Sequence, residues 1–277
     1  MTGLTLIASY PKSGNTWMRS LLASLRLGGR TPDINGDLGA GSAADRKLHD
    51  IVAQAECSDL TPGEVARLRP AVSRWLARER PGIYKAHDAF LIPPEGLEPA
   101  IPADAISRVI VITRDPRDVA VSFAHHLGVS YGEAVKTMGD EGARMGRSDA
   151  ALNANVEQHL SSWSSHTCSW LDAVDLRRLH VRYEDMSDRP GVVLDQVCRF
   201  LELPVQPAEI AAAVEATTFR TLARQEASAG FRERHPASSA RFFREGRAGA
   251  WRDHLPQVLA DRIADDHGPM MLRLGYL

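Results

Sequence analysis

The feature that most constrains this chain lies near its start, where a short strand is followed by a basic loop and then by a helix. Leu4 to Ala8 form an apolar run typical of a buried strand. From Trp17 to Leu25 apolar residues recur at helical spacing. Between the two lies Ser9-Tyr10-Pro11-Lys12-Ser13-Gly14-Asn15-Thr16. Because the first N–H groups of a helix and the positive end of its dipole attract anions, this arrangement predicts an anion-binding loop.

The side chains of this loop suit the same kind of ligand. Lys12 adds a full positive charge, Gly14 lets the backbone approach an anion closely, and Ser13, Asn15 and Thr16 add donors. The order differs from the P-loop of NTPases, which closes a glycine-rich run with Gly-Lys-Ser/Thr. The alternative is a strand-to-helix turn with an exposed lysine.

A second strand end carries an arginine. Arg108 to Ile112 form a β-branched run typical of a buried parallel strand, and Thr113-Arg114-Asp115-Pro116 follows it. Asp115 is expected to cap the next helix, with Pro116 at its first position. Arg114 therefore lies at the carboxyl end of a strand, where open α/β sheets bind ligands, and its fork suits a phosphate.

Two further residues bear on this arginine. Ser122, two turns into the helix, can add a hydroxyl donor on the same side. The alternative for Arg114 is an ion pair with Asp115 or Asp118.

A third short strand, Ile83 to Ala86, is followed by a histidine. Side chains alternate along a strand, so Lys85 and His87 are expected to point the same way. A cation and a base on one face can share a site. From spacing alone, a Lys-x-His pair more often lies on the protein surface without a function.

Composition narrows the class of protein. The 277 residues are 44% hydrophobic and 25% charged, with no Pro/Gly/Ser linker, so we expect one domain, residues 1–277. A net charge of −2 gives no support for a nucleic-acid partner.

The three cysteines show no metal spacing and no disulfide framework, which fits a reducing compartment. The first apolar run is too short for a signal peptide or a membrane span, so we expect a cytoplasmic protein without a membrane partner.

Other elements follow from local patterns. Thr61 to Glu64 form a capping box that opens a helix to about Arg78. Leu160, Trp163, Thr167, Trp170 and Val174 form a helical stripe expected in the core. Leu179 to Met186 predict a strand running into a loop. We also expect helices over 192–201, 209–214 and 257–274, and a helix that opens at Thr217-Thr218-Phe219. A polar loop is expected over 227–249, and residues 139–150 are expected to form a mobile lid or acceptor loop.

The loop and the strand-end arginine together resemble a known family. Tyr10 to Trp17 closely resemble, over eight consecutive positions, the 5′-phosphosulfate loop of sulfotransferases that use PAPS (3′-phosphoadenosine 5′-phosphosulfate). Arg114 to Ser122 resemble that family's second signature, which binds the 3′-phosphate through the arginine and the serine. With both motifs in the right order, about a hundred residues apart, the chain is identified as a bacterial-looking member of the cytosolic type.

The resemblance extends to further positions. Lys85-Ala86-His87 is similar to the family's Lys-x-His, whose histidine is the general base. It implies catalytic roles for His87, Lys12, Lys85 and Ser122. It implies cofactor binding by Lys12, Ser13, Gly14, Asn15, Thr16, Trp17, Arg114, Ser122, Tyr183, Thr218, Phe219, Arg244, Glu245 and Gly246.

The chain also departs from the family pattern. Glu245 stands where many relatives have a lysine, and Ala250 replaces a common aspartate. Whether Arg247 compensates for Glu245 stays open at this point. The dimer motif of animal cytosolic members is absent, so the oligomeric state is open as well.

The implied fold is α/β: a P-loop-like parallel sheet flanked by helices in three layers. The implied reaction moves a sulfuryl group from PAPS to a hydroxyl, or an amine, of a small-molecule acceptor, without a metal, and leaves adenosine 3′,5′-bisphosphate (PAP). The acceptor itself is not readable, and we expect loops within 30–60, 88–100 and 128–150 to form its pocket. Two alternatives remain: a P-loop kinase or NTPase that uses ATP and Mg²⁺, and a non-catalytic nucleotide-binding or scaffold protein.

Overall fold

The computed structural model describes residues 3–39, 41–91, 98–146, 152–235, 237–238 and 240–277. The chain forms two compact units, each built from three separate stretches. The first unit comprises residues 1–10, 40–111 and 140–180, and the second comprises residues 11–39, 112–139 and 181–277.

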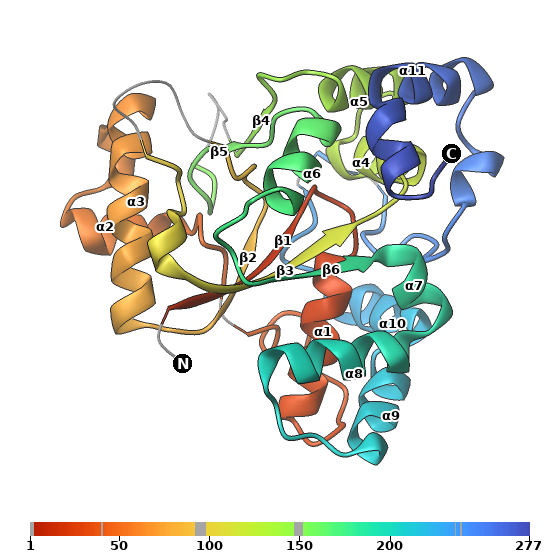
Figure 1. Ribbon diagram of the computed structural model, residues 1–277, viewed down its shortest axis with the longest axis horizontal. Coiled ribbons are helices and arrows are strands. Elements are labelled where there is room, and N and C mark those ends of the chain that lie inside the picture. The colour runs from red at the N-terminus through yellow and green to blue at the C-terminus, as the bar shows by residue number, and fades with distance from the viewer. Residues whose placement is uncertain (1–2, 40, 92–97, 147–151, 236, 239) are drawn as a thin grey trace. The chain divides into compact units, whose positions relative to one another are not determined.

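The central element is a four-stranded sheet with strand order β2-β1-β3-β6 (Figure 1). Its strands are β1 (Leu4–Ser9), β2 (Ile83–Ala86), β3 (Ile106–Thr113) and β6 (Arg178–Arg182). β1 pairs with β2 in parallel, from Thr5 opposite Ile83 to Ala8 opposite Ala86. Every residue of β1 is buried, which explains its continuous apolar sequence. The predicted α/β class, with a parallel sheet flanked by helices, is confirmed.

Helices and one short strand pair complete the first unit. They are α2 (Arg46–Ala53), α3 (Pro62–Glu79), α6 (Trp163–Leu171), and β4 (Arg144–Met145) paired with β5 (Gln158–His159). Short 3₁₀ turns cover Cys57–Asp59 and Ala103–Ala105. α3 begins at the predicted capping box, in which the Thr61 and Glu64 side chains accept each other's backbone N–H groups.

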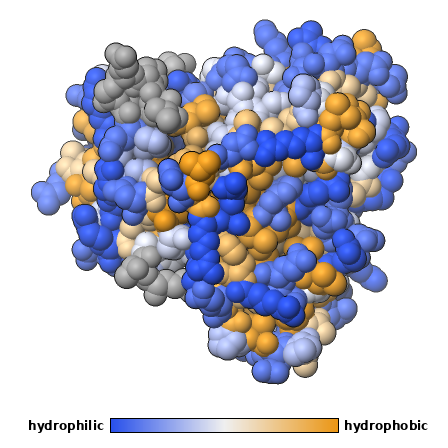
Figure 2. All heavy atoms as spheres, viewed as in Figure 1, coloured by the Kyte–Doolittle hydropathy of each residue, from blue (hydrophilic) through white to orange (hydrophobic). Residues whose placement is uncertain are grey.

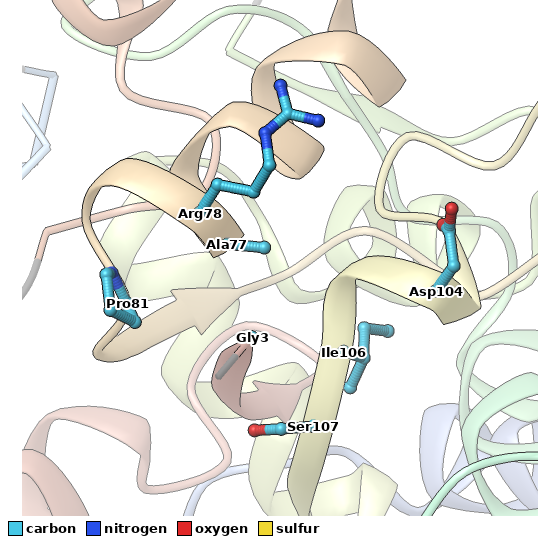
Figure 3. A pocket seen from close by; sticks show the side chains of 7 residues that line it. All are labelled: Gly3, Ala77, Arg78, Pro81, Asp104, Ile106 and Ser107. Carbon is cyan, nitrogen blue, oxygen red and sulfur yellow. The ribbon is translucent and has the colours of Figure 1, made fainter. Parts of the chain in front are cut away.

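A pocket lies at the amino ends of β1 and β3 (Figure 3). Gly3, Ala77, Arg78, Pro81, Asp104, Ile106 and Ser107 line it. None of the predicted site residues is among them, and His87 follows the opposite, carboxyl end of β2.

The second unit is mainly helical. Its elements are α1 (Asn15–Arg26), α4 (Pro116–Leu127), α5 (Tyr131–Met138), α7 (Tyr183–Asp188), α8 (Pro190–Leu201), α9 (Pro207–Ala216), α10 (Phe219–Ala229), a 3₁₀ turn (Ala250–Asp253) and α11 (Gln257–Arg273). α9 packs on α1 and α8, and α11 packs on α4 and α5 (Figure 1). An aromatic cluster joins Trp17, Phe231, Phe242 and Phe243 with the apolar side chains Ala23, Ile34, Leu38 and Leu222.

Two local predictions are wrong. The stripe from Leu160 to Val174 is not one helix, because Ser162 caps α6 and Asp172 follows its end. Its first four residues are buried in the core as predicted, but Val174 is 88% exposed. After β6 the chain forms helix α7 rather than a loop, with Glu184 and Asp185 in the first turn, where the helix dipole favours acidic residues.

Other segments were not predicted or lie partly outside the description. Helices α2 and α5 have no counterpart in the sequence analysis, although Ser130 and Glu133 form a capping box at the start of α5. In the expected lid, residues 140–146 contain a turn and β4, and residues 147–150 lie outside the described residues.

Within the described ranges, no helix has both the length and the apolar character that crossing a bilayer requires. The face shown in Figure 2 is largely hydrophilic, with hydrophobic residues in several separate groups.

Candidate functional site

The basic loop after β1 has an unusual backbone. Gly14, the N-cap of α1, has φ 106°, a conformation that L-residues rarely adopt. A Cβ at Gly14 would also lie 2.7 Å from Cδ2 of Tyr183, so glycine is required there on two grounds. Lys12 has φ 69°, and strain at a non-glycine residue is often stored at functional sites.

The Lys12 side chain lies against an aromatic ring. Its Nζ is 3.3 Å from the centroid of the Phe242 ring, a cation–π contact. The pKa of Lys12 is lowered from 10.5 to about 7, mainly by burial and also by the nearby Arg114 charge, while Glu233 and Glu226 act in the opposite direction. Lys12 is therefore a cation whose charge depends on its immediate neighbours, and an anionic ligand would favour its protonated form.

Buried donors around the loop lack partners. Ser13 Oγ and Arg114 Nε are both buried without a hydrogen-bond partner among the described residues. The first turn of α1 contains no acidic residue that would occupy its N–H groups. Because buried polar groups are normally hydrogen-bonded, orphaned donors beside a helix N-terminus fit a phosphate or sulfate group.

Arg114 connects the loop with two other segments. Its Nη1 donates to the Lys12 carbonyl at 3.2 Å and its Nη2 to the Arg247 carbonyl at 3.3 Å. The guanidinium carbon lies 4.1 Å from the centroid of the Tyr183 ring. The Arg114 guanidinium therefore contacts both the predicted loop, at Lys12, and the predicted tyrosine, Tyr183.

The acidic alternatives for Arg114 are resolved. Asp115 caps α4 as predicted and pairs with Arg117 at 2.8 Å. Asp118 lies 3.8 Å from Arg114, but its carboxylate also accepts from the N–H groups of Gly249 and Trp251, at 2.7 and 2.8 Å. Burial raises the pKa of Asp118, against the opposing effect of Arg114. The Asp118 carboxylate thus holds the 249–251 turn and only partly neutralises Arg114.

Ser122 lies one helical turn after Asp118 on α4. Residues four apart share a helix face, so its hydroxyl is on the face where Asp118 binds the 249–251 turn. It is partly exposed. The predicted serine therefore lies on the Arg114 side of α4.

Aromatic side chains surround the loop. Trp17 Nε1 donates to the Thr217 carbonyl at 3.1 Å, and its ring is 6.0 Å from that of Tyr183. Thr218 caps α10, directly before Phe219. Gly246, with φ 63°, packs so closely on the Phe219 ring that a Cβ there would lie 2.1 Å from Cδ2. The two predicted segments, 217–219 and 244–246, are thus in contact.

The family-atypical Glu245 is neutralised within its own segment. Its carboxylate accepts from Arg244 Nη1 and lies 2.6 Å from His254 Nε2. The Arg247 guanidinium pairs with Asp253, and only the Arg247 carbonyl contacts Arg114. The Arg247 side chain therefore does not take the place of the missing lysine, and Arg244 is the cation next to Glu245.

The predicted base belongs to the first unit. His87 Nδ1 lies 2.9 Å from the Ser9 carbonyl oxygen, which can only accept a hydrogen bond. Nδ1 therefore carries the proton, and the lone pair of the neutral ring is on Nε2. Lys85 and His87 are both partly exposed, whereas the residues between and beside them are buried, as the predicted alternation requires.

A network that the sequence analysis missed holds the backbone at His87. His166 Nε2 donates to the His87 carbonyl at 3.1 Å, and Trp170 Nε1 donates to the Asp88 carbonyl at 2.9 Å. The Asp88 carboxylate forms a bidentate ion pair with Arg69, at 2.7 and 2.6 Å. Burial lowers the pKa of His166 to about 3, so its ring is neutral. The sequence offered one signal for this network, the carboxylate of Asp88 two residues after β2, because a buried carboxylate is usually paired.

The structure thus groups the predicted residues in two sets. Lys85 and His87 belong to the first unit, and all the other predicted site residues belong to the second. In the part of the chain that the structure describes, no cluster of His, Cys, Asp and Glu is arranged to hold a metal.

Comparisons with known proteins all match this chain to sulfotransferases. The family model described as sulfotransferase domain matches residues 4–274. Cytosolic sulfotransferase 16 of Arabidopsis thaliana is 25% identical over 93% of this chain and 73% of its own length, and sulfotransferase 1E1 of Mus musculus is 24% identical over 95% and 81%.

Solved structures share the fold. Mouse sulfotransferase SULT7A1 complexed with PAP has a TM-score of 0.57 at 18% identity and covers 96% of this chain and 83% of its own. Retinol dehydratase in a complex with retinol and PAP has a TM-score of 0.60 at 17% identity and covers 96% and 80%.

Proposed function

This chain belongs to the sulfotransferase domain family, and we propose that the sulfuryl group it transfers comes from PAPS and goes to a hydroxyl or amine of a small-molecule acceptor. The observation that carries the proposal is the cluster of Lys12, Arg114 and Tyr183 around the loop, with orphaned donors at Ser13 and Arg114. Two structures with the same fold were solved with PAP, and one of them with the small molecule retinol.

The donor contacts follow from the charges and rings of the second unit. Lys12, Ser13 and the first N–H groups of α1 would bind the 5′-phosphosulfate, together with Asn15 and Thr16. Arg114, Ser122 and Arg244 would bind the 3′-phosphate, and Trp17 and Phe219 would pack on the adenine.

The chemistry is in-line transfer of a charged group. The bond between sulfur and the 5′-phosphate oxygen breaks while a bond from sulfur to the acceptor oxygen or nitrogen forms, so negative charge grows on the phosphate oxygen. Lys12 stabilises that charge, and such stabilisation speeds the step because it strengthens in the transition state. Nε2 of His87 takes the acceptor proton, a contribution of typically about 10²–10⁴-fold, and Lys85 assists with the moving sulfuryl oxygens.

The experiment that tests this proposal is a calorimetric titration with PAP and with ADP, each with and without Mg²⁺. Metal-independent binding of PAP in preference to ADP supports the donor assignment. Preference for ADP with Mg²⁺ would favour a kinase or NTPase, and binding of neither would favour a non-catalytic scaffold. We further propose that the chain acts in the cytoplasm, as the name of the Arabidopsis relative indicates for that protein.

A further inference from the structure

A buried carboxylate in the second unit has no role in the reaction described above. Glu226 lies in the last turn of α10 and is only 5% exposed. Its two oxygens accept from two successive backbone N–H groups, Phe242 at 2.6 Å and Phe243 at 2.9 Å. A buried carboxylate is costly unless it is well hydrogen-bonded, so these two bonds account for its presence.

The two residues that Glu226 holds lead directly into the predicted donor segment. Phe242 places its ring over Lys12 Nζ, and Phe243 lies edge-on to Phe219 at 6.4 Å. Arg244, Glu245 and Gly246 follow at once in the sequence. Any shift of the backbone at 242–243 therefore moves a contact of Lys12 and the start of the Arg244 segment together.

We propose that Glu226 is a positioning residue that fixes residues 242–246 against the donor loop and so sets the affinity for the donor. This inference rests on the proposed function, since it assigns Glu226 to the same donor site.

The geometry explains why the residue is a carboxylate. Two adjacent N–H groups need two acceptor oxygens, and a glutamine offers one oxygen and one donor NH₂ group. Glu226→Gln keeps nearly the same side-chain volume, but it would place the glutamine NH₂ group against the backbone N–H of Phe242 or Phe243. Charged hydrogen bonds are the strong ones, so the loss should be specific and large.

Glu226 has a second effect on the same site. Its negative charge is one of two that raise the pKa of Lys12, the other being that of Glu233. Glu233 is itself paired with Arg19 at 2.8 Å. Glu226, in contrast, has no arginine partner among the described residues. Removing its charge should leave Lys12 less protonated.

The test is the affinity of PAP for the full chain, measured by calorimetry at pH 7 for three proteins. These are the native protein, Glu226→Gln and the control Glu215→Gln, which removes the same charge from an exposed position on α9. We expect PAP to bind at least tenfold more weakly to Glu226→Gln, with greater proton uptake on binding, and equally well to the control. Proton uptake reports the charge of Lys12, which a merely structural role of Glu226 would not change.

The outcomes separate the two proposals. Unchanged affinity in Glu226→Gln, with tight binding to the native protein, overturns the positioning role alone. Absence of PAP binding to the native protein overturns the proposed function, and the positioning role with it. Should Glu226→Gln fail to fold, hydrogen exchange on the native protein decides: the Phe242 and Phe243 amides should exchange more slowly than that of Arg244, and fast exchange at both would refute the proposal.

Discussion

The buried ion pair between Arg69 and Asp88 lies next to the His87 backbone in the first unit, and its contribution to stability can be measured directly. We expect Asp88→Asn to destabilise the protein strongly, because it leaves the Arg69 guanidinium buried without its counter-charge. The side chains are 6% and 4% exposed, and the two terminal guanidinium nitrogens, Nη1 and Nη2, reach the carboxylate at 2.7 and 2.6 Å.

The magnitude follows from burial and from the remaining partners. Breaking a buried pair by removing one partner typically costs about 3–5 kcal/mol, against about 0–1 kcal/mol for an exposed pair. Asp88 also accepts from the His159 N–H at 3.0 Å, and Arg69 donates to the Glu157 carbonyl at 3.0 Å. Those bonds keep each remaining group partly satisfied, so we expect Asp88→Asn near the lower end of the range.

The assay is urea unfolding of the native protein, Asp88→Asn, Arg69→Met and the double variant. If each single variant leaves an uncompensated group, the double variant should lose less free energy of unfolding than the two single losses combined. As a surface control, Arg144→Met removes an arginine that is 51% exposed and paired with Glu157, and we expect a loss of at most about 1 kcal/mol. Losses below about 1 kcal/mol in both single buried variants, or simple additivity, would refute the reasoning.

Three further predictions concern the proposed reaction. His87→Ala should abolish turnover while leaving PAP affinity largely intact, as measured by product formation and calorimetry; near-normal turnover would remove His87 as the base. Arg114→Ala should weaken PAP binding by about 1.5–3 kcal/mol, the usual value of a charged hydrogen bond, and unchanged affinity would contradict the 3′-phosphate assignment. PAP affinity should fall as the pH rises from 7 to 9, since Lys12, with a pKa of about 7 in the free protein, loses its charge over that range while the phosphates are already ionised. The fall is at most about tenfold per pH unit for one proton, and a flat calorimetric profile over that range would exclude Lys12 as the titrating contact.

What the sequence predicts well here depends on local chemistry. The strand–loop–helix start, the Thr61 capping box and the Asp115 cap each depend on residues within a few positions of one another, and all three are confirmed. The contact between Lys12 and Arg114 joins residues about a hundred positions apart. The resemblance of two motifs to one family implied that both bind one cofactor, but the contact itself was not predicted.

The predictions that failed needed information from distant residues. Val174 fits a helical stripe, yet α6 ends at Leu171 and leaves it in solvent. The partners of Asp88 and of Glu226 lie 16 to 82 positions away, and neither contact leaves a periodic pattern in the sequence. Buried charges are placed by such tertiary contacts, so a sequence alone shows that a charge exists but not what neutralises it.

The interleaving of the two units has a consequence for how the protein is made. The first unit contains no residue beyond 180, so its whole sequence is synthesised before residues 181–277. The donor site that we propose includes Tyr183, Phe219 and the 244–246 segment, all of which lie in that last stretch. A nascent chain can therefore fold the unit that holds His87 before the proposed donor site is complete. A chain truncated before that last stretch would keep the proposed base without the proposed donor pocket.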